Sequence, residues 1–99
     1  MRYDRYRWNE TRGDEYDSLG HSTHLLEVGE DEYAVRQMEI YDNETVLKYN
    51  SQHLSDEYGM LADKALDAEE LKESGTENIS AEEFEVIWNS LKALNQHNL

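Results

Sequence analysis

The tripeptide Asp-Glu-Tyr occurs three times in this sequence, at 14–16, 31–33 and 56–58. Each copy joins two carboxylates, which steer a cationic partner, to a tyrosine ring, which anchors the partner once water has left the contact. The repeats predict an acidic, aromatic surface that binds a protein. The predicted binding residues are these triplets, flanking acids and one further tyrosine: Asp14, Glu15, Tyr16, Asp17, Glu30, Asp31, Glu32, Tyr49, Asp56, Glu57 and Tyr58.

Two simpler explanations of the triplets remain open. A chain rich in Glu, Asp and Tyr repeats such short words by chance. Tyr33 in particular stands where a strand is expected to begin, so its ring is also expected in the core. The acidity itself has two alternatives to partner binding, namely a merely solvated surface and an adaptation to strong salt.

Other residue types that do chemistry give no site. His21 and His24 are three apart, a spacing that suits a metal only on a helix, and this stretch has the pattern of a loop and a strand. Without cysteine, the chain has no disulfide, no thiolate zinc site and no cysteine nucleophile. The sequence contains no nucleophile elbow, phosphate-binding loop or dinucleotide fingerprint. We therefore expect no enzyme activity, no metal and no cofactor.

The charge of the chain restricts its partners. Asp and Glu number 23 against 9 Lys and Arg, which gives a formal net charge of −14. A nucleic-acid backbone and an anionic membrane would both be repelled, so the expected partner is a basic protein. The cations gather at the start, where Arg2, Arg5, Arg7 and Arg12 stand close together. Because arginine offers a two-pronged donor to carboxylates, we expect them to pair with acids elsewhere in the fold.

Hydrophobic alternation predicts strands in the first half. Four strands are expected at 2–8, 24–28, 33–41 and 45–49, with tight turns at 29–32 and 42–44. Asn43 suits a left-handed backbone in the second turn. On the first strand, Tyr6 and Trp8 share one face with Asp4, while Tyr3 points to the other. Short turns favour an antiparallel meander over residues 1–50.

The second half changes to a helical period. Asp67 and Ser80 each precede a Glu by three residues, as helix-capping residues do, and predict two helices within 67–94. The last helix is expected to run from 81 to 94, with Phe84, Ile87, Trp88, Leu91 and Leu94 on one face. Residues 51–66 are expected as a loop with short helical pieces, and 95–99 as a frayed tail.

These elements predict one α+β domain over 1–99. It has a single-layer antiparallel sheet of about four strands, with the C-terminal helices packed on one face. Trp8 and Trp88 are expected in the core, where they join the first strand to the last helix. With no apolar stretch of membrane-spanning length and no signal-peptide pattern, the chain is expected to be a cytoplasmic protein, monomeric when free.

A family resemblance rests on three stretches of the chain. They are Arg7-Trp8, the central run Glu27-Val28 with Glu32–Tyr41, and the late run Ile79–Trp88. Together they resemble an uncharacterised bacterial domain family of about this length. In size, acidity and lack of catalytic motifs, that family is similar to immunity proteins of bacterial toxin systems, including contact-dependent growth inhibition. The resemblance implies binding and blocking of a toxin delivered by a neighbouring cell.

Charge and resemblance together predict the function. The chain is expected to bind a cognate basic toxin domain and to occlude its active site. The toxin domain is expected to be a nuclease, and an RNase in preference to a DNase. One alternative is an acidic mimic of nucleic acid that inhibits a host DNA-binding protein, as anti-restriction proteins do. Another is a generic protein-interaction adaptor.

Overall fold

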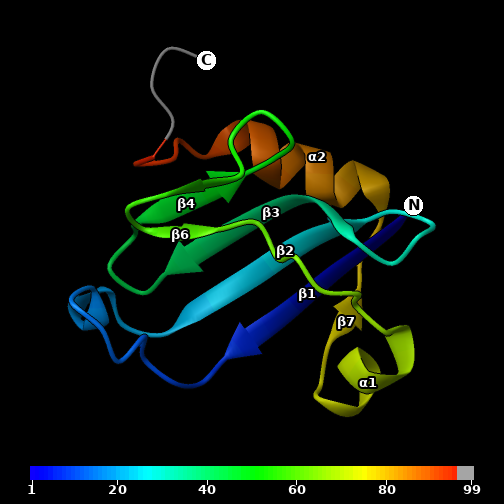
Figure 1. Cartoon of the computed structure of the whole chain (residues 1–99), viewed down its shortest axis with the longest axis horizontal. Coiled ribbons are helices and arrows are strands. Elements are labelled where there is room, and N and C mark those ends of the chain that lie inside the picture. Colours follow the sequence, from blue (N-terminus) through cyan, green and yellow to red (C-terminus); the bar gives the residue numbers. More distant parts are fainter. Residues whose placement is uncertain (96–99) are drawn as a thin grey trace.

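The computed structural model describes residues 1–95 and contains a five-stranded antiparallel sheet in the order β4-β3-β2-β1-β7 (Figure 1). Its strands are β1 (Arg2–Trp8), β2 (Ser22–Val28), β3 (Ala34–Tyr41), β4 (Val46–Tyr49) and β7 (Glu77–Asn78). The helix α2 (Ala81–Ser90) packs on one face of this sheet. The α+β class predicted from the sequence is confirmed.

All four predicted strands form, and the last three are joined by the predicted tight turns. In the turn after β3, the residue with a left-handed backbone is Glu44, with φ 74°, and not Asn43. Asn43 instead accepts a hydrogen bond from the Thr45 backbone N–H at 3.0 Å through its side chain. That side-chain bond holds the turn without a left-handed residue at Asn43 itself.

The first core lies between the sheet and α2. Leu25, Met38 and Val46 project from three neighbouring strands and bury the ring of Phe84. Tyr3 joins them from β1, with its ring 5.2 Å from that of Phe84. Ser80 caps the start of α2 with its side chain, which accepts a hydrogen bond from the Glu83 backbone N–H at 3.0 Å, as the capping pattern predicted.

The last helix is shorter than expected, because it ends at Ser90 rather than at 94. Leu91 is extended, and the backbone N–H of Leu94 donates to the Val46 carbonyl at 2.8 Å, so the chain turns to run along the open edge of β4. The predicted frayed tail begins too early. Asn95 is buried and bonds both backbone groups of Lys48. Residues 96–99 of that predicted tail lie outside the described residues.

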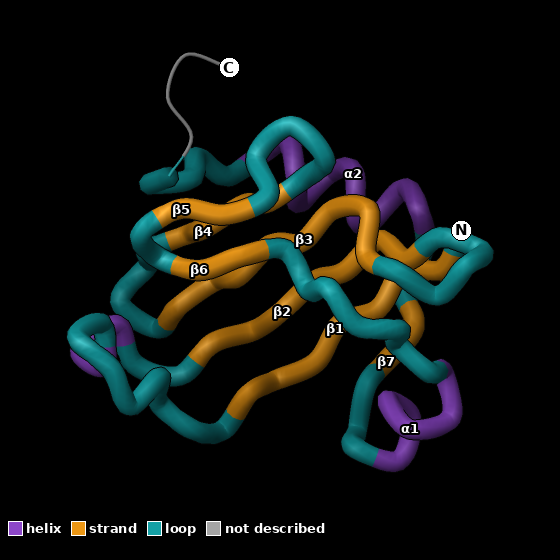
Figure 2. The backbone as a smooth tube through the Cα atoms, viewed as in Figure 1, coloured by secondary structure: helices purple, strands orange, loops and turns teal. Residues whose placement is uncertain are grey.

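The other predicted helix is a single short one, α1 (Ala68–Glu73). Asp67 caps it by accepting from the backbone N–H groups of Glu69 and Glu70. This helix lies beside β7 at the edge of the sheet, not with α2 on one face as predicted (Figure 2). After α1 the chain pairs Asn78 with Asp4, which adds the fifth strand.

The second face of the sheet carries its own core. Tyr41, Leu47 and Tyr49 are buried there under Leu19, Tyr58 and Leu61. The covering segment, 51–66, contains no helix, contrary to the prediction. It forms a two-stranded hairpin of β5 (Ser55–Asp56) and β6 (Gly59–Met60), drawn over the sheet in Figure 2. Leu61 packs on this second core from the irregular chain after β6, whereas Leu54 is 57% exposed.

The two tryptophans do not meet, so the predicted link between them is wrong for Trp8. Trp88 packs on the α2 face, with its ring 5.8 Å from that of Phe84. Trp8 has the same strand parity as Asp4 and Tyr6, so it projects from the opposite face and is 46% exposed. Among the described residues, no helix has the length and apolarity needed to cross a membrane.

Candidate functional site

Two of the three Asp-Glu-Tyr triplets lie side by side in the fold. The loop 9–21 brings Tyr16 against Tyr58 of the β5–β6 hairpin, with ring centroids 5.1 Å apart and ring planes tilted by 52°. Glu15, Asp17 and Glu57 are exposed around the two partly buried rings. We call these five residues the tyrosine patch: Glu15, Tyr16, Asp17, Glu57 and Tyr58. Segments more than forty positions apart in the sequence thus form one surface.

Arg12 ties the two halves of the tyrosine patch together. Its Nε donates to Asp14 at 3.2 Å, and its guanidinium lies 5.1 Å from the Tyr16 ring centroid. Its Nη2 donates to the backbone carbonyl of Tyr58. Asp14 is therefore a support of the patch as well as an exposed acid, because its other oxygen accepts from the Tyr16 backbone N–H at 2.8 Å.

Asp56 shapes the hairpin half of the tyrosine patch. One of its oxygens accepts from the backbone N–H groups of Tyr58 and Gly59, which turns the chain between β5 and β6. Burial by itself raises the pKa of Asp56. Hydrogen bonds from the side chains of His53, Asn95 and Tyr49 and from the Tyr58 backbone outweigh this effect and lower the pKa to about 2. The predicted binding residue Asp56 is therefore a partly buried anchor of the hairpin.

Tyr49 does not belong to the surface. It is 0% exposed, and its hydroxyl donates to Asp56 at 3.0 Å beneath the hairpin. Burial and the Asp56 carboxylate both raise the pKa of Tyr49. Its ring holds the hairpin to the sheet, and its sequence position at the end of β4 gave no sign of this role.

The third triplet lies in the turn between β2 and β3, at the far end of β2 from the tyrosine patch. Glu30, Asp31 and Glu32 are exposed there, and the Glu32 backbone carbonyl accepts from the Leu66 N–H at 2.7 Å. Tyr33 is 47% exposed, so the expectation that it is a core residue is wrong. This triplet has the same residue types as the other two without their tyrosine contact.

The arginines form ion pairs within the protein. Arg5 and Arg7 pair with acids far along the chain, as predicted, whereas Arg2 and Arg12 pair with acids two positions away. The carboxylate partners of the arginines lie within 3.4 Å: Asp4 for Arg2, Glu77 and Glu83 for Arg5, Asp42 for Arg7, Asp14 for Arg12, and Glu27 and Glu85 for Arg36. Arg36 also covers the rings of Phe84 and Trp88. Most of the remaining positive charge lies on three exposed lysines, Lys64, Lys72 and Lys92.

Acidic side chains act on both tyrosines of the patch. Burial raises the pKa of the Tyr16 hydroxyl, and the carboxylates of Glu15 and Glu57 raise it further against the opposing effect of Arg12. The pKa of Tyr58 is raised by burial and by its neighbour Glu57. Acids from both triplets thus act on the same pair of rings, which is the arrangement that attracts a cation.

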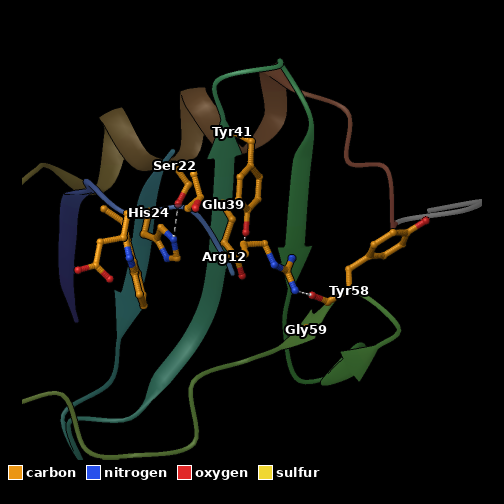
Figure 3. Close-up of a pocket in the computed structure, with 10 residues that line it drawn as sticks. Arg12, Ser22, His24, Glu39, Tyr41, Tyr58 and Gly59 are labelled. Carbon is orange, nitrogen blue, oxygen red and sulfur yellow. Dashed lines mark hydrogen bonds between the residues drawn. The ribbon is translucent and has the colours of Figure 1, made fainter. Parts of the chain in front are cut away.

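Within residues 1–95, no three His, Asp or Glu side chains are grouped so that they could hold a metal ion. His24 lies instead in a cavity beside the tyrosine patch, with Trp8, Arg12, Ser22 and Glu39 (Figure 3). No motif in the sequence predicted this cavity. The alternation of side chains along the strands could have indicated it, because alternate residues of a strand share one face of the sheet. The polar residues on this face are Ser22 and His24 of β2 and Glu39 and Tyr41 of β3.

No family model, curated protein or solved structure matches this chain.

Proposed function

We propose that this protein is an immunity protein, which binds and neutralises a cognate basic toxin domain in the cytoplasm. The toxin domain is a nuclease, an RNase in preference to a DNase. Inhibition is by occlusion of the active site and involves no catalysis by the immunity protein. The observation that carries the proposal is the meeting of two Asp-Glu-Tyr triplets in the tyrosine patch.

The charge of a nuclease makes this partner fitting. A nuclease presents cationic groups to the phosphates of its substrate, so its active site attracts an acidic surface. The net charge of −14 gives the protein a long-range attraction to such a partner. This attraction raises the association rate constant toward roughly 10⁸–10⁹ M⁻¹s⁻¹ at low salt. Glu15, Asp17 and Glu57 would then stand where the phosphates of the substrate sit.

Attraction alone does not give a stable complex, and the two rings supply what is missing. Tyrosine is enriched at binding hot spots, where a ring is fully desolvated at the centre of the contact. Tyr16 and Tyr58 are adjacent, partly exposed and surrounded by carboxylates, which resembles a hot spot within a polar rim. The free protein is proposed to be a monomer that meets the toxin through this surface.

The test uses the product of the gene next to that of this protein, which the proposal requires to contain a nuclease toxin domain. Tyr16→Ala with Tyr58→Ala is expected to weaken the complex by at least about thirtyfold, the factor that corresponds to a hot-spot loss of roughly 2 kcal/mol. The matched control is Tyr33→Ala, which removes the ring of the third triplet and should leave affinity unchanged. Calorimetric titration gives the affinities, and cleavage of a labelled RNA reports inhibition.

Three results would contradict the proposal. One is the absence of a complex with that domain at about micromolar concentration. Another is a complex that forms but leaves RNA and DNA cleavage unaffected. The third is equal loss of affinity in Tyr33→Ala and the double variant, which would separate binding from the tyrosine patch.

A further inference from the structure

The cavity beside the tyrosine patch is large enough for a small ring compound. It lies between the second face of the sheet and the β5–β6 hairpin and has a volume of about 270 Å³ (Figure 3). An apolar cavity of roughly 150 Å³ already holds benzene. The space therefore suits one ring or two fused rings.

One wall of the cavity is aromatic and is formed by Trp8 and His24, whose ring planes are tilted by 32°. The Trp8 ring centroid lies 5.5 Å from that of His24, which in turn stacks on Tyr6 at 4.9 Å. His24 is held in place through both ring nitrogens, with Ser22 Oγ at 2.9 Å and the Tyr6 hydroxyl at 3.2 Å. A planar ligand can lie against this wall without reordering it, which lowers the entropic cost of binding.

Arg12 lines the cavity with a guanidinium that interacts with the Tyr41 hydroxyl and whose Nη1 has no hydrogen-bond partner of normal geometry in residues 1–95. Its Nε and Nη2 are fixed by Asp14 and by the Tyr58 carbonyl, whereas its Nη1 is buried without a partner. A buried donor without an acceptor is costly, and a guanidinium binds oxygen acceptors more strongly than a neutral donor does. The ligand should therefore bring a carbonyl oxygen.

Glu39 offers a complementary acceptor. Its side chain is 7% exposed, with one oxygen bonded by the Tyr41 hydroxyl at 2.5 Å and the other by the Gln37 amide at 2.8 Å. A carboxylate has about four lone-pair sites, so each oxygen can accept once more. Among the described residues, no cation forms an ion pair with Glu39.

We propose that this cavity binds an uncharged planar lactam ring of the nucleobase type. The ring lies along Trp8 and His24, its carbonyl accepts from Arg12 Nη1, and its N–H donates to Glu39. A phosphate on the ligand is disfavoured, because Glu10 lines the cavity with its exposed carboxylate and the whole molecule is anionic. This ligand site does not depend on the proposed toxin binding.

The ligand arm of the test compares four compounds by calorimetric titration, with Trp8 emission as a second readout. Uracil and uridine are expected to bind and to change that emission. Uracil methylated on both ring nitrogens keeps the ring and the carbonyls but has no N–H, and we expect it to bind about tenfold more weakly or worse. Uridine monophosphate is expected to bind more weakly than uridine.

The protein arm changes each polar partner. Arg12→Lys keeps the positive charge but removes the planar guanidinium. Glu39→Gln keeps the shape of the side chain but removes its charge. Each variant is expected to bind uracil about tenfold more weakly than the unchanged protein does. Arg5→Gln, on the α2 side of the sheet, is the matched control and should bind as the unchanged protein does. Circular dichroism verifies that each variant is folded.

The proposal is overturned if uracil fails to bind at millimolar concentration, or if the dimethylated ring binds as tightly. It is also overturned if folded Arg12→Lys and Glu39→Gln bind uracil unchanged. Tighter binding of uridine monophosphate than of uridine would replace it with a phosphate site. The comparison of ligands on the unchanged protein decides the matter even if a variant fails to fold.

Discussion

Lys48 places a cation in the interior of an otherwise acidic protein. Its side chain is 6% exposed, and its Nζ donates to the backbone carbonyls of Trp88 at 2.6 Å and Leu91 at 2.5 Å. These carbonyls stand at the C-terminal end of α2, where helical N–H partners run out and the helix dipole is negative. Burial lowers the pKa of Lys48, because desolvation disfavours its charged form.

Lys48→Met should therefore destabilise the protein although it retains the apolar part of the side chain. The variant leaves two carbonyls at the end of α2 without a donor, and we expect a loss of about 1–3 kcal/mol in the free energy of unfolding. Urea denaturation measures it. The control is Lys92→Met, which is exposed and should change stability little. Equal urea midpoints for the two variants would contradict the role assigned to Lys48.

His24 makes stability depend on pH in a defined direction. Burial holds the pKa of its imidazole below the ordinary value, Glu39 opposes this shift and Arg12 adds to it. The folded state then binds fewer protons than the unfolded state, so stability is complete above about pH 6.5 and is lost as pH falls through that value. Hydrogen-bond partners at Tyr6 and Ser22 fix the ring that must charge.

The measurement is the melting temperature between about pH 7.5 and about pH 5.5, a window that lies above the titration of ordinary carboxylates. His24→Phe keeps a ring against Trp8 but cannot be protonated, so it should be less stable at the upper pH and show a flatter profile. His21→Gln is the control and should keep the slope of the unchanged protein. A slope that survives in His24→Phe would assign it to another group.

At the scale of elements, local patterns were enough where short-range contacts decide the structure. The caps at Asp67 and Ser80 and the tight turns between β2, β3 and β4 each depend on neighbours within a few residues, and they were predicted. The β5–β6 hairpin depends on Asp56, which accepts from Tyr49 and from Asn95, 39 positions away. No pattern within 51–66 contains that information.

In the candidate site too, local features were predicted from the sequence, and contacts between distant residues were not. Composition and the triplets predicted an acidic, aromatic surface, but not that Tyr16 and Tyr58 would touch while Tyr33 stands apart. That pairing requires the path of the loop 9–21, which Arg12 fixes through a backbone carbonyl far along the chain. The cavity required the register of β2 on β3, which sets His24 beside Glu39.

Docking of α2 on the sheet can be tested with the two tryptophans. Trp88 packs on Phe84 and carries Arg36 and Lys48 against its faces, each about 5 Å from the ring. Trp88→Ala should cost about 3 kcal/mol, the lower end for this substitution because the ring is partly exposed. Trp8→Ala, on the other face, should cost about 1 kcal/mol or less. Comparable losses in the two variants would contradict this assignment of faces.

At the scale of the whole molecule, two effects of salt oppose each other. Salt weakens the arginine ion pairs, but Arg5 and Arg7 pair at exposed positions, where such a pair contributes only about 0–1 kcal/mol. The partly buried Arg36–Glu27 pair, with Nε and Oε1 2.7 Å apart, is screened less. Salt also weakens the repulsion among the remaining carboxylates. Because the net charge is −14, we expect this relief of repulsion to exceed the weakening of the ion pairs.

The melting temperature should therefore rise between about 10 mM and about 150 mM NaCl, as the Debye length falls from roughly 30 Å to roughly 8 Å. Glu30→Gln with Glu73→Gln removes two exposed charges outside the ion pairs, so it should raise the melting temperature at low salt and reduce the gain from added salt. Calorimetry of both proteins over this range measures the two slopes. A melting temperature that stays flat or falls with salt would mean that the ion pairs outweigh the repulsion among the carboxylates. The acidic surface would then lower the stability of the fold little while remaining able to bind cations.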